Sequence, residues 1–376
     1  MPMKRRLFLL SAGLAAAGVS AAASPLLPLL ARRPARGSAK GQPVLVLLEL
    51  KGGNDGLNTV IPYRDPAYRS ARPTLAINDG PLLGDDLMLH PALSPLMGVW
   101  GAKRLAFALG VGWDKPSRSH FRAQDQWATG TPAGEGDGWF AAAVARGQEQ
   151  RSLVALGPSG SAALEGAGAL SVQMHPQAQQ EAGRGRRNDP LEPSRAGSNL
   201  ILRRMLELEA AGNQEVQRLL QSLAALPNGL TLPRGSLGEQ MGLALRLIGS
   251  PDPPAVIQIE PGGFAGFDTH AQQLVRHGRS LAQLGEALAA FDQGLRMMTN
   301  RPQVSLLAVS EFGRRLQQNA SGGTDHGSAS VAVLLGDGVP HPFLGSYPSL
   351  TDLDERGDLL PSFSPVQLYD KMMVYS

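Results

Sequence analysis

Alternation between short apolar runs and longer segments with helical periodicity constrains the fold of this chain most strongly. The run Val44–Leu50 is almost continuously apolar and lies between Pro43 and Gly52, a pattern typical of a strand buried on both faces. Further runs of this character are Leu105–Val111, Ala255–Ile259, Val304–Val309 and Val331–Leu335, with a shorter candidate at Ser152–Leu156.

Helical periodicity fills several of the intervals between these runs. From Leu281 to Met298, apolar side chains recur every three or four residues, as they do on the buried face of an amphipathic helix. Residues 199–226 and 237–248 have a similar pattern. Strands that alternate with helices predict an α/β fold with a mainly parallel sheet.

The first 23 residues have the features of an export signal. A basic segment precedes an apolar stretch at residues 7–19, and residues 21–23 provide a small-residue cleavage site. Residues 5–9 read RRLFL, which resembles the twin-arginine motif R-R-x-F-L. We therefore expect the twin-arginine translocase to carry the protein to the periplasm or out of the cell. The stretch is short and rich in glycine and alanine, so we expect no permanent membrane span.

Charge balance and the lack of cysteine exclude several classes of protein. The chain has 35 basic and 32 acidic residues, and the excess of three equals Lys4, Arg5 and Arg6 of the leader. The remainder is neutral and lacks the basic field of a nucleic-acid-binding protein. The absence of cysteine excludes disulfide bonds, thiolate metal sites and a cysteine nucleophile.

Two segments have the composition of connecting chain. Residues 24–42 are rich in proline, arginine and alanine, which predicts a linker after the leader. Residues 158–200 are rich in glycine, serine, alanine and glutamine, with a basic patch at Arg184–Arg187. We expect this second segment to be an insertion or a mobile loop.

Polar clusters follow four of the five strong strands. They contain Asn54-Asp55, Ser119-His120, Asp268-Thr269-His270 and Ser310-Glu311, with Asp325-His326 in a loop shortly after the last of these. Three of the seven histidines fall in these clusters. The carboxyl ends of parallel strands meet at one edge of a sheet, so residues far apart in the sequence are expected to converge there.

Taken singly, these residues have ordinary structural explanations. Asp55 and Asp268 suit turns or helix caps, and Ser119 suits the N-cap of a helix. Glu311 can pair with a nearby arginine, and His326 can be an ordinary loop residue. Together, however, carboxylates and imidazoles at one edge are a ligand set for divalent zinc, manganese or magnesium. A serine hydroxyl beside them would be a metal-activated nucleophile, and a helix N-terminus favours phosphate or sulfate.

Several blocks of the sequence resemble a known family of bacterial proteins. LELKGGNDGLNTVIP, SRSHFRAQDQWATG, FDTHAQQ, SEFGRR and GGTDHGSASVAVLLG occur in this order after the twin-arginine start. They resemble the domain-of-unknown-function 1501 family, commonly exported proteins regarded as distant relatives of the alkaline phosphatase and sulfatase superfamily. The resemblance implies that residues 43–376 form a single alkaline-phosphatase-like domain, a three-layer α/β/α fold with a mainly parallel sheet.

The resemblance also implies roles for individual residues. The positions that resemble metal ligands are Asp55, Asp268, His270, Glu311 and His326. Ser119 resembles the nucleophile, and Arg118 or Arg314 would clamp the non-bridging oxygens of the substrate, since guanidinium pairs bidentately with such groups.

The chain departs from the superfamily pattern in three places. Glu311-Phe312 replaces the usual Asp-His, so the second metal site would be all oxygen and would favour magnesium, manganese or calcium over zinc. The spacing in Asp268-Thr269-His270 is shorter than in alkaline phosphatase. The arylsulfatase signature is absent at Ser119, which disfavours formylglycine-dependent sulfatase activity.

The leading functional prediction is an exported metal-dependent hydrolase of phosphate or sulfate esters, in which Ser119 attacks a small anionic ester. The predicted cofactors are divalent metal ions: zinc, manganese, magnesium or calcium. The alternative is a catalytically silent protein of the cell envelope that binds metal, a polysaccharide or a partner protein. A third possibility is a mutase or an ester transferase on the same fold.

Overall fold

A central sheet of eight strands organises the residues that the structure, a computed structural model, describes: 41–147, 151–158, 160–175, 193–261 and 266–375. The predicted leader, nearly all of the predicted linker and the basic patch at 184–187 lie outside these residues. In sheet order, the strands are β12 (Phe343–Leu344), β4 (Leu105–Val111), β11 (Ser330–Gly336), β8 (Val304–Val309), β1 (Val44–Glu49), β7 (Val256–Ile259), β5 (Leu153–Leu156) and β6 (Ser171–Met174).

The sheet is mainly parallel, as predicted. Strand β1 runs parallel to β8 and β7, β5 runs parallel to β7 and β6, and β12 runs parallel to β4. Only β11 runs antiparallel to its neighbours within the described sheet, β4 on one side and β8 on the other. Two small antiparallel pairs lie outside it: β2 (Val60–Ile61) with β3 (Met88–Leu89), and β9 (Arg314–Gln318) with β10 (Thr324–His326).

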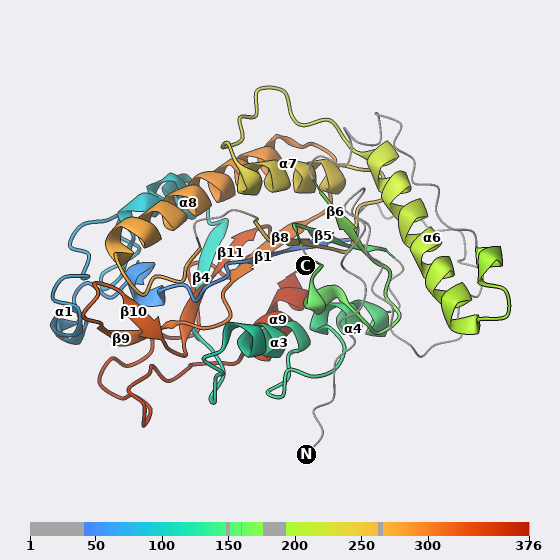
Figure 1. The fold of residues 1–376 in the computed structure, drawn as a ribbon. Helices are drawn as coiled ribbons and strands as arrows, with labels where there is room; N and C mark the ends of the chain where they lie inside the picture. Colours follow the sequence, from blue (N-terminus) through green and yellow to red (C-terminus); the bar gives the residue numbers. More distant parts are fainter. Residues whose placement is uncertain (1–40, 148–150, 159, 176–192, 262–265, 376) are drawn as a thin grey trace, which may run out of the picture.

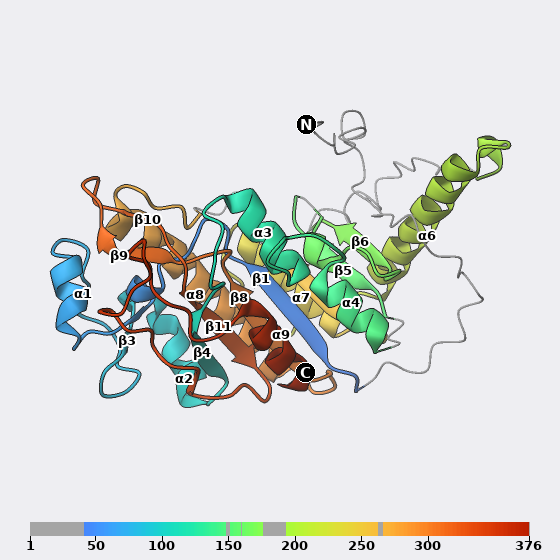
Figure 2. The same ribbon diagram turned by 90° about the horizontal axis from the view of Figure 1, so that it is seen from below.

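Helices cover both faces of the sheet, which confirms the three-layer α/β/α prediction (Figure 1). One face carries α7 (Ser236–Ile248) and α8 (Gln273–Met297), with α2 (Met97–Gly101) beside them. The other carries α3 (His120–Thr129), α4 (Trp139–Arg146) and α9 (Pro365–Tyr375), which lie in front of the strands in Figure 2. The remaining helices are α1 (Pro66–Ala71), α6 (Leu200–Ser222), η1 (Gly56–Asn58), η2 (Pro91–Leu96), η3 (Ala162–Leu164) and η4 (Pro193–Ala196).

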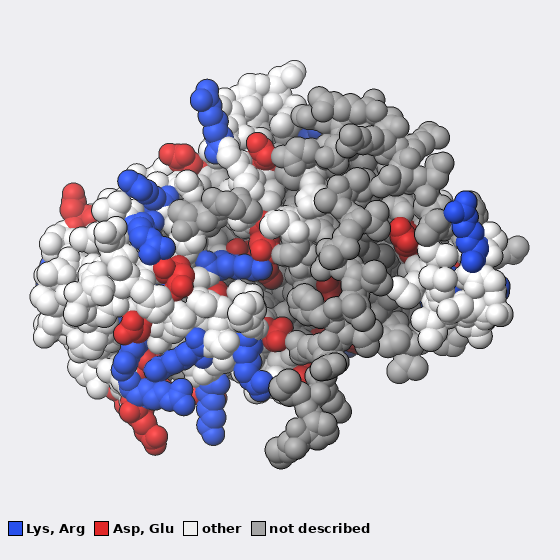
Figure 3. Space-filling model, in the orientation of Figure 1, with Lys and Arg blue, Asp and Glu red and all other residues white. Residues whose placement is uncertain are grey.

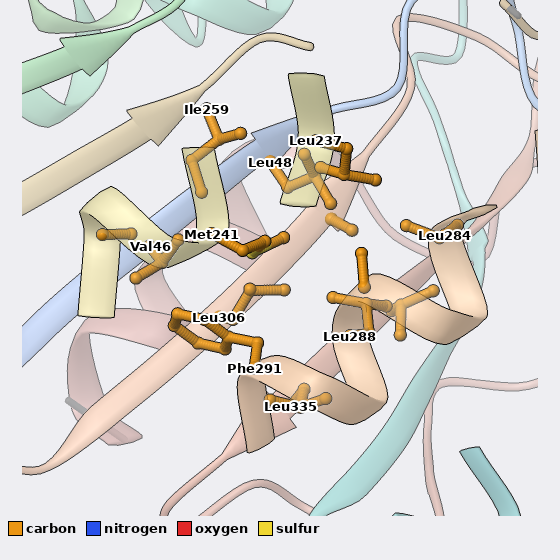
Figure 4. Close-up of a cluster of buried hydrophobic side chains, with 14 of the residues drawn as sticks. Val46, Leu48, Leu237, Met241, Ile259, Leu284, Leu288, Phe291, Leu306 and Leu335 are labelled. Carbon is orange, nitrogen blue, oxygen red and sulfur yellow. The ribbon is translucent and has the colours of Figure 1, made fainter. Parts of the chain in front are cut away.

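Alternation along β1 explains why its sequence is apolar on both sides. Val46 and Leu48 face the layer of α7 and α8, where Met241 and Phe291 pack against them (Figure 4). Leu45 and the other intervening side chain of the strand belong to the second core cluster, with the aromatic residues of α4 and α9. Successive side chains of a strand point to opposite faces, so a strand between two helical layers needs apolar residues at every position.

Residues 171–174 differ from their sequence-based expectation. They lie within the segment predicted to be an insertion or a mobile loop, yet they form the edge strand β6 and pair in register with β5. Four residues, of which Ser171 and Gln173 are polar, do not make an apolar run, so composition gives no signal of a strand here.

One face of the molecule can be compared with the neutral charge expected after the first 23 residues. On the described part of the face in Figure 3, acidic and basic side chains are interspersed. Among the helices of the described residues, none combines the length and the apolar composition needed to cross a membrane.

Candidate metal centre

Four separate segments bring polar side chains to the carboxyl edge of the central strands. His120 is the first residue of α3, after the loop that follows β4. Asp268 and His270 lie between β7 and α8, and Glu311 follows β8. His326 ends β10, shortly before β11. Because β11 runs antiparallel to β4 and β8, its beginning, not its end, lies at this edge.

Each of three imidazoles is held at Nδ1 by an oxygen that only accepts hydrogen bonds. The Nδ1 of His120 lies 2.8 Å from Oε1 of Glu311, and the Nδ1 of His326 lies 2.8 Å from the carbonyl oxygen of Arg118. The Nδ1 of His270 lies 3.2 Å from Oδ1 of Asp325. In each pair the imidazole donates, so a neutral ring presents an unprotonated Nε2 on its other side.

The three Nε2 atoms converge on the carboxylate of Asp268. The Nε2 atoms of His270 and His326 lie 3.0 and 3.2 Å from Oδ1, and that of His120 lies 3.5 Å from Oδ2. The Nε2 atoms of His270 and His326 are 2.9 Å apart. Among the described residues, His120, Asp268 and His326 each offer a ligand atom, and these three atoms all lie within 4.8 Å of one another.

This arrangement fits a divalent metal ion. Nitrogen lone pairs that face one another and a carboxylate repel unless a proton or a cation lies between them. Ligand atoms around a tetrahedral zinc ion are about 3.3 Å apart, given metal–ligand bonds of about 2.0–2.1 Å, which is close to the spacing here. An oxygen acceptor at Nδ1 is the usual support of a metal-binding histidine. His120, Asp268 and His326, with His270 beside them, can therefore hold the ion.

Glu311 contacts Nδ1 of His120, on the other side of the ring from the Nε2 that faces Asp268. Its side chain is 3% exposed and accepts from the backbone N–H groups of Gly52 and Gly53 and from the hydroxyl of Ser310. Burial raises its pKa, but the hydrogen bond from His120 and the backbone N–H of Gly52 outweigh burial and hold the pKa below its usual range. Glu311 thus stays ionised and orients the imidazole of His120.

Arg314 binds the Gly52–Gly53 loop and Asp268 together. Its buried guanidinium donates to the carbonyl oxygens of both glycines and to Oδ1 of Asp268, at 2.6 Å. Burial opposes ionisation of Asp268, but this arginine and His326 lower its pKa to about 2. The loop approaches so closely that a Cβ on Gly52 would lie 2.4 Å from the backbone nitrogen of Asp268, with φ at +118°. Arg314 therefore holds the Gly52–Gly53 loop and Asp268 in position, and its positive charge is already paired with the carboxylate of Asp268.

Asp55 occupies a second, fully buried cluster. Its Oδ2 lies 2.6 Å from Nη1 of Arg72, it accepts from the side chain of Gln273, and Oδ1 caps η1 at Leu57. Burial alone would raise its pKa, yet the charge and hydrogen bonds of Arg72 bring it below its usual range. The carboxylate that the resemblance placed among the metal ligands is neutralised by an arginine.

Ser119 and Arg118 directly precede His120 at the start of α3. Ser119 is exposed and takes the N-cap position, but its hydroxyl makes no capping hydrogen bond to the described residues. Arg118 lends its carbonyl oxygen to His326, while its guanidinium, one-third exposed, pairs with Asp358. Of the two predicted arginine clamps, only Arg118 reaches solvent.

His120 and Arg72 are the residues of these clusters that the sequence patterns do not identify. His120 belongs to one of the polar clusters of the sequence but is not among the ligands that the resemblance implies; the signal for it is that three histidines fall in these clusters. Arg72 lies in the segment after α1, far from any recognised motif, and only the fold brings it to Asp55.

Comparison with known proteins gives a family for this chain. A family model described as "Protein of unknown function (DUF1501)" matches residues 91–352, which is more than half of the chain. The chain belongs to this family. The prediction made from the sequence blocks is thus confirmed, although the family description assigns no activity. Among curated proteins, none matches the chain.

Solved structures with a similar fold are C-terminal periplasmic domains and a membrane protein. The domain of EcEptC from Escherichia coli, in complex with zinc, has a TM-score of 0.43 and 8% identity, over 90% of this chain and 83% of that one. The domain of the phosphoethanolamine transferase EptC from Campylobacter jejuni has a TM-score of 0.38 and 8% identity, over 89% and 90%. The lipooligosaccharide phosphoethanolamine transferase A from Neisseria meningitidis has a TM-score of 0.36 and 10% identity, over 81% and 49%.

Proposed function

We propose that this protein is an exported metal-dependent hydrolase of phosphate or sulfate esters, with Ser119 as the nucleophile. The observation that carries the proposal is the convergence of three supported imidazoles on Asp268, directly beside an exposed serine at a helix N-terminus. Nitrogen-rich ligands favour zinc over magnesium or calcium. When bound, the ion would supply positive charge that lowers the pKa of a nearby hydroxyl and neutralises an ester oxygen.

The residues of the chain supply the remaining requirements. The hydroxyl of Ser119 is free of a capping role among the described residues and lies next to His120 in the sequence. The first turn of an α-helix has backbone N–H groups without intrahelical partners, which suit the oxygens of a phosphate or sulfate group, and α3 begins at His120. Asp268 and His270 are nearly half exposed, so that a substrate can reach this edge from solvent.

Metal analysis and a panel of phosphate and sulfate esters test the proposal. We expect the Ser119→Ala protein to keep its metal and to lose ester hydrolysis by orders of magnitude, because only the nucleophile is removed. An exposed serine away from the site, in the variant Ser198→Ala, serves as the matched control and should keep full activity. Near-complete activity of Ser119→Ala would show that water or another group attacks.

A catalytically silent metal-binding protein is the second candidate. The pairing of Asp55 with Arg72 favours it, because a two-metal centre, with ions about 3.5–4 Å apart, needs further uncommitted ligands. Stoichiometric metal binding without hydrolysis of any ester on the panel would support this candidate over the hydrolase.

We also propose export through the twin-arginine route, on the evidence of residues 5–9. Replacement of Arg5 and Arg6 by lysine should leave the precursor in the cytoplasm, measured by fractionation. The variant Lys4→Gln, which changes the same basic segment without touching the pair, should still be exported. Undiminished export of the double lysine variant would contradict this route.

A further inference from the structure

The N-terminal end of α6 extends away from the body of the protein. The C-terminal half of this helix is anchored, because Val216 and Leu219 belong to the same hydrophobic core as Val46 of β1. At a rise of about 1.5 Å per residue, Leu200 lies about 24 Å along the helix axis from Val216. Figures 1 and 2 both show α6 beyond the edge strand β6, with η4 at its free end. We call this projecting end, residues 193–206, the α6 tip.

The α6 tip carries a cluster of exposed apolar side chains. Their exposed fractions are 73%, 76%, 41% and 50% for Leu200, Ile201, Leu202 and Met205. Four of the ten exposed large apolar side chains among the described residues thus fall within residues 200–205. Single exposed apolar residues are ordinary on protein surfaces, but a contiguous group indicates a surface that contacts another molecule or a membrane.

Three of these side chains share one face of the helix. Met205 follows Ile201 by four positions and Leu202 by three, and side chains at these spacings are neighbours on an α-helix. Leu200 continues the apolar surface around the first turn. The side chain of Asn199 caps this turn, because it accepts from the backbone N–H of Leu202 at 2.9 Å. A capped helix therefore presents the apolar face.

The charge of the α6 tip is entirely positive. Residues 193–206 include Arg195, Arg203 and Arg204 and contain no acidic residue. The next acid along the helix, Glu207, pairs with Arg204 at 3.3 Å, and both side chains are about two-fifths exposed, so this ion pair is weak. The local excess of positive charge contrasts with a chain that is neutral after its first 23 residues. The α6 tip thus combines an apolar face with flanking cations.

An anionic membrane surface matches both properties. Apolar side chains of interfacial helices enter the boundary between lipid headgroups and acyl chains to a depth of about 5–10 Å, and neighbouring arginines are attracted to anionic headgroups. Arginine can keep its guanidinium at the headgroups while its aliphatic stem lies along apolar surface. A second copy of this chain does not match, because a symmetric contact between two α6 tips would place the same arginines against one another.

We propose that the α6 tip docks the protein on the surface of an anionic lipid bilayer. Ile201, Leu202 and Met205 enter the interfacial layer, and the three arginines of the tip lie at the headgroups. The helix binds to the surface and does not span the membrane. The docking depends on neither the metal centre nor ester hydrolysis, so it stands or falls separately from the proposed function.

A fluorophore on an introduced cysteine tests the proposal, because the chain has no cysteine of its own. The label is NBD, whose emission shifts to the blue in apolar surroundings. On Ile201→Cys, we expect a saturable blue shift with vesicles of phosphatidylglycerol and phosphatidylcholine, and little change with pure phosphatidylcholine. The control is Leu82→Cys, since Leu82 is 58% exposed and the segment between α1 and β3 lies far from α6 in Figures 1 and 2. The absence of a shift at position 201, or an equal shift at both positions, would overturn the proposal.

Arginine variants of the labelled protein test the role of charge. Arg203→Gln combined with Arg204→Gln should raise the lipid concentration needed for half of the blue shift by about fivefold for each arginine, and added salt should raise it further. Arg64→Gln, which removes an arginine that is 61% exposed at a distant site, should leave this concentration unchanged, and circular dichroism should show that each variant is folded. An unchanged lipid concentration in the double variant would contradict docking on anionic lipid. A blue shift that grows with protein concentration in the absence of vesicles would identify a second copy as the occupant and overturn the proposal.

Discussion

Two polar clusters at this edge of the sheet each pair an aspartate with a buried arginine, but they differ in the other groups that surround the carboxylate and in its exposure to solvent. In the metal cluster, formed by His120, Asp268, His270 and His326, nitrogen lone pairs converge on one carboxylate at a position open to solvent. In the buried cluster, Asp55 meets a full positive charge from Arg72 and an amide from Gln273.

This difference shows that residue type alone does not identify a metal ligand. Asp55 and Asp268 both follow strands and both have pKa values below the usual range. Asp55 has no exposed surface and is neutralised within the protein, so it stabilises the fold. Asp268 is 45% exposed. Arg314 pairs with its Oδ1, whereas the recorded contact of its Oδ2 among the described residues is with Nε2 of His120, so this second oxygen remains available to a cation.

The largest expected effect is on the buried cluster. Asp55→Ala leaves the guanidinium of Arg72 buried without its partner, which should cost about 3–5 kcal/mol of the free energy of unfolding, measured by urea denaturation. Asp86→Ala removes a surface aspartate that is 80% exposed and should change stability by about 0.5 kcal/mol or less. If Asp55→Ala instead lost metal and kept its stability, Asp55 would be a ligand and the comparison would fail.

A smaller expected effect, also on the buried cluster, is on the pH dependence of the free energy of unfolding. Burial lowers the pKa of His277 to about 3 and that of His90 to about 4, so both are neutral in the folded state. The unfolded chain takes up protons below about pH 6.5, and stability must fall as the pH drops from there toward the folded pKa values.

Each of these histidines contributes a slope of up to about 1.4 kcal/mol per pH unit. His277→Asn should flatten the unfolding free energy of metal-free protein between about pH 6.5 and 4, relative to the unmodified chain. An unchanged slope of the unfolding free energy with pH would mean that His277 is protonated in the folded protein, and that the buried cluster is accessible to water.

The smallest expected effects concern how much each histidine of the metal cluster contributes to metal affinity. His120→Ala should weaken metal binding more than His270→Ala, measured by competition with a chelator. The reason is that Glu311, 3% exposed, fixes His120, whereas Asp325, 56% exposed, holds His270 loosely. Removal of the metal should lower stability by about 2.7 kcal/mol when the ion was present at a hundred times its Kd. Equal losses in both variants would show that the two imidazoles are equivalent ligands.

The apolar pattern of the sequence was sufficient to predict the layers of the fold, but not the order and direction of the strands within the sheet. Val44–Leu50 and the four similar runs form central strands, because burial on both faces requires apolar residues at every position. Short polar strands such as β6 carry no such pattern, and the antiparallel course of β11 depends on the preceding hairpin of β9 and β10. These features follow from tertiary pairing and not from local sequence.

The convergence of polar clusters was predictable, but the partners within them were not. Asp268, His270 and His326 come together as expected of strand-end residues at one edge. The position of Glu311 beside His120 depends on the Gly52–Gly53 loop, whose backbone N–H groups donate to both carboxylate oxygens of Glu311. No spacing in the sequence records that contact, since its partners are 259 positions apart.

The wide separation of the metal-binding segments has a consequence for biosynthesis. His120 and Glu311 are 191 positions apart, and Arg118 and His326 are 208 apart. A ribosome must therefore synthesise the chain through Glu311 before the first of these contacts can form and through His326 before the second, and forming them has a large entropic cost of loop closure. A metal ion held between His120 and His326 would therefore report that the chain has folded through His326.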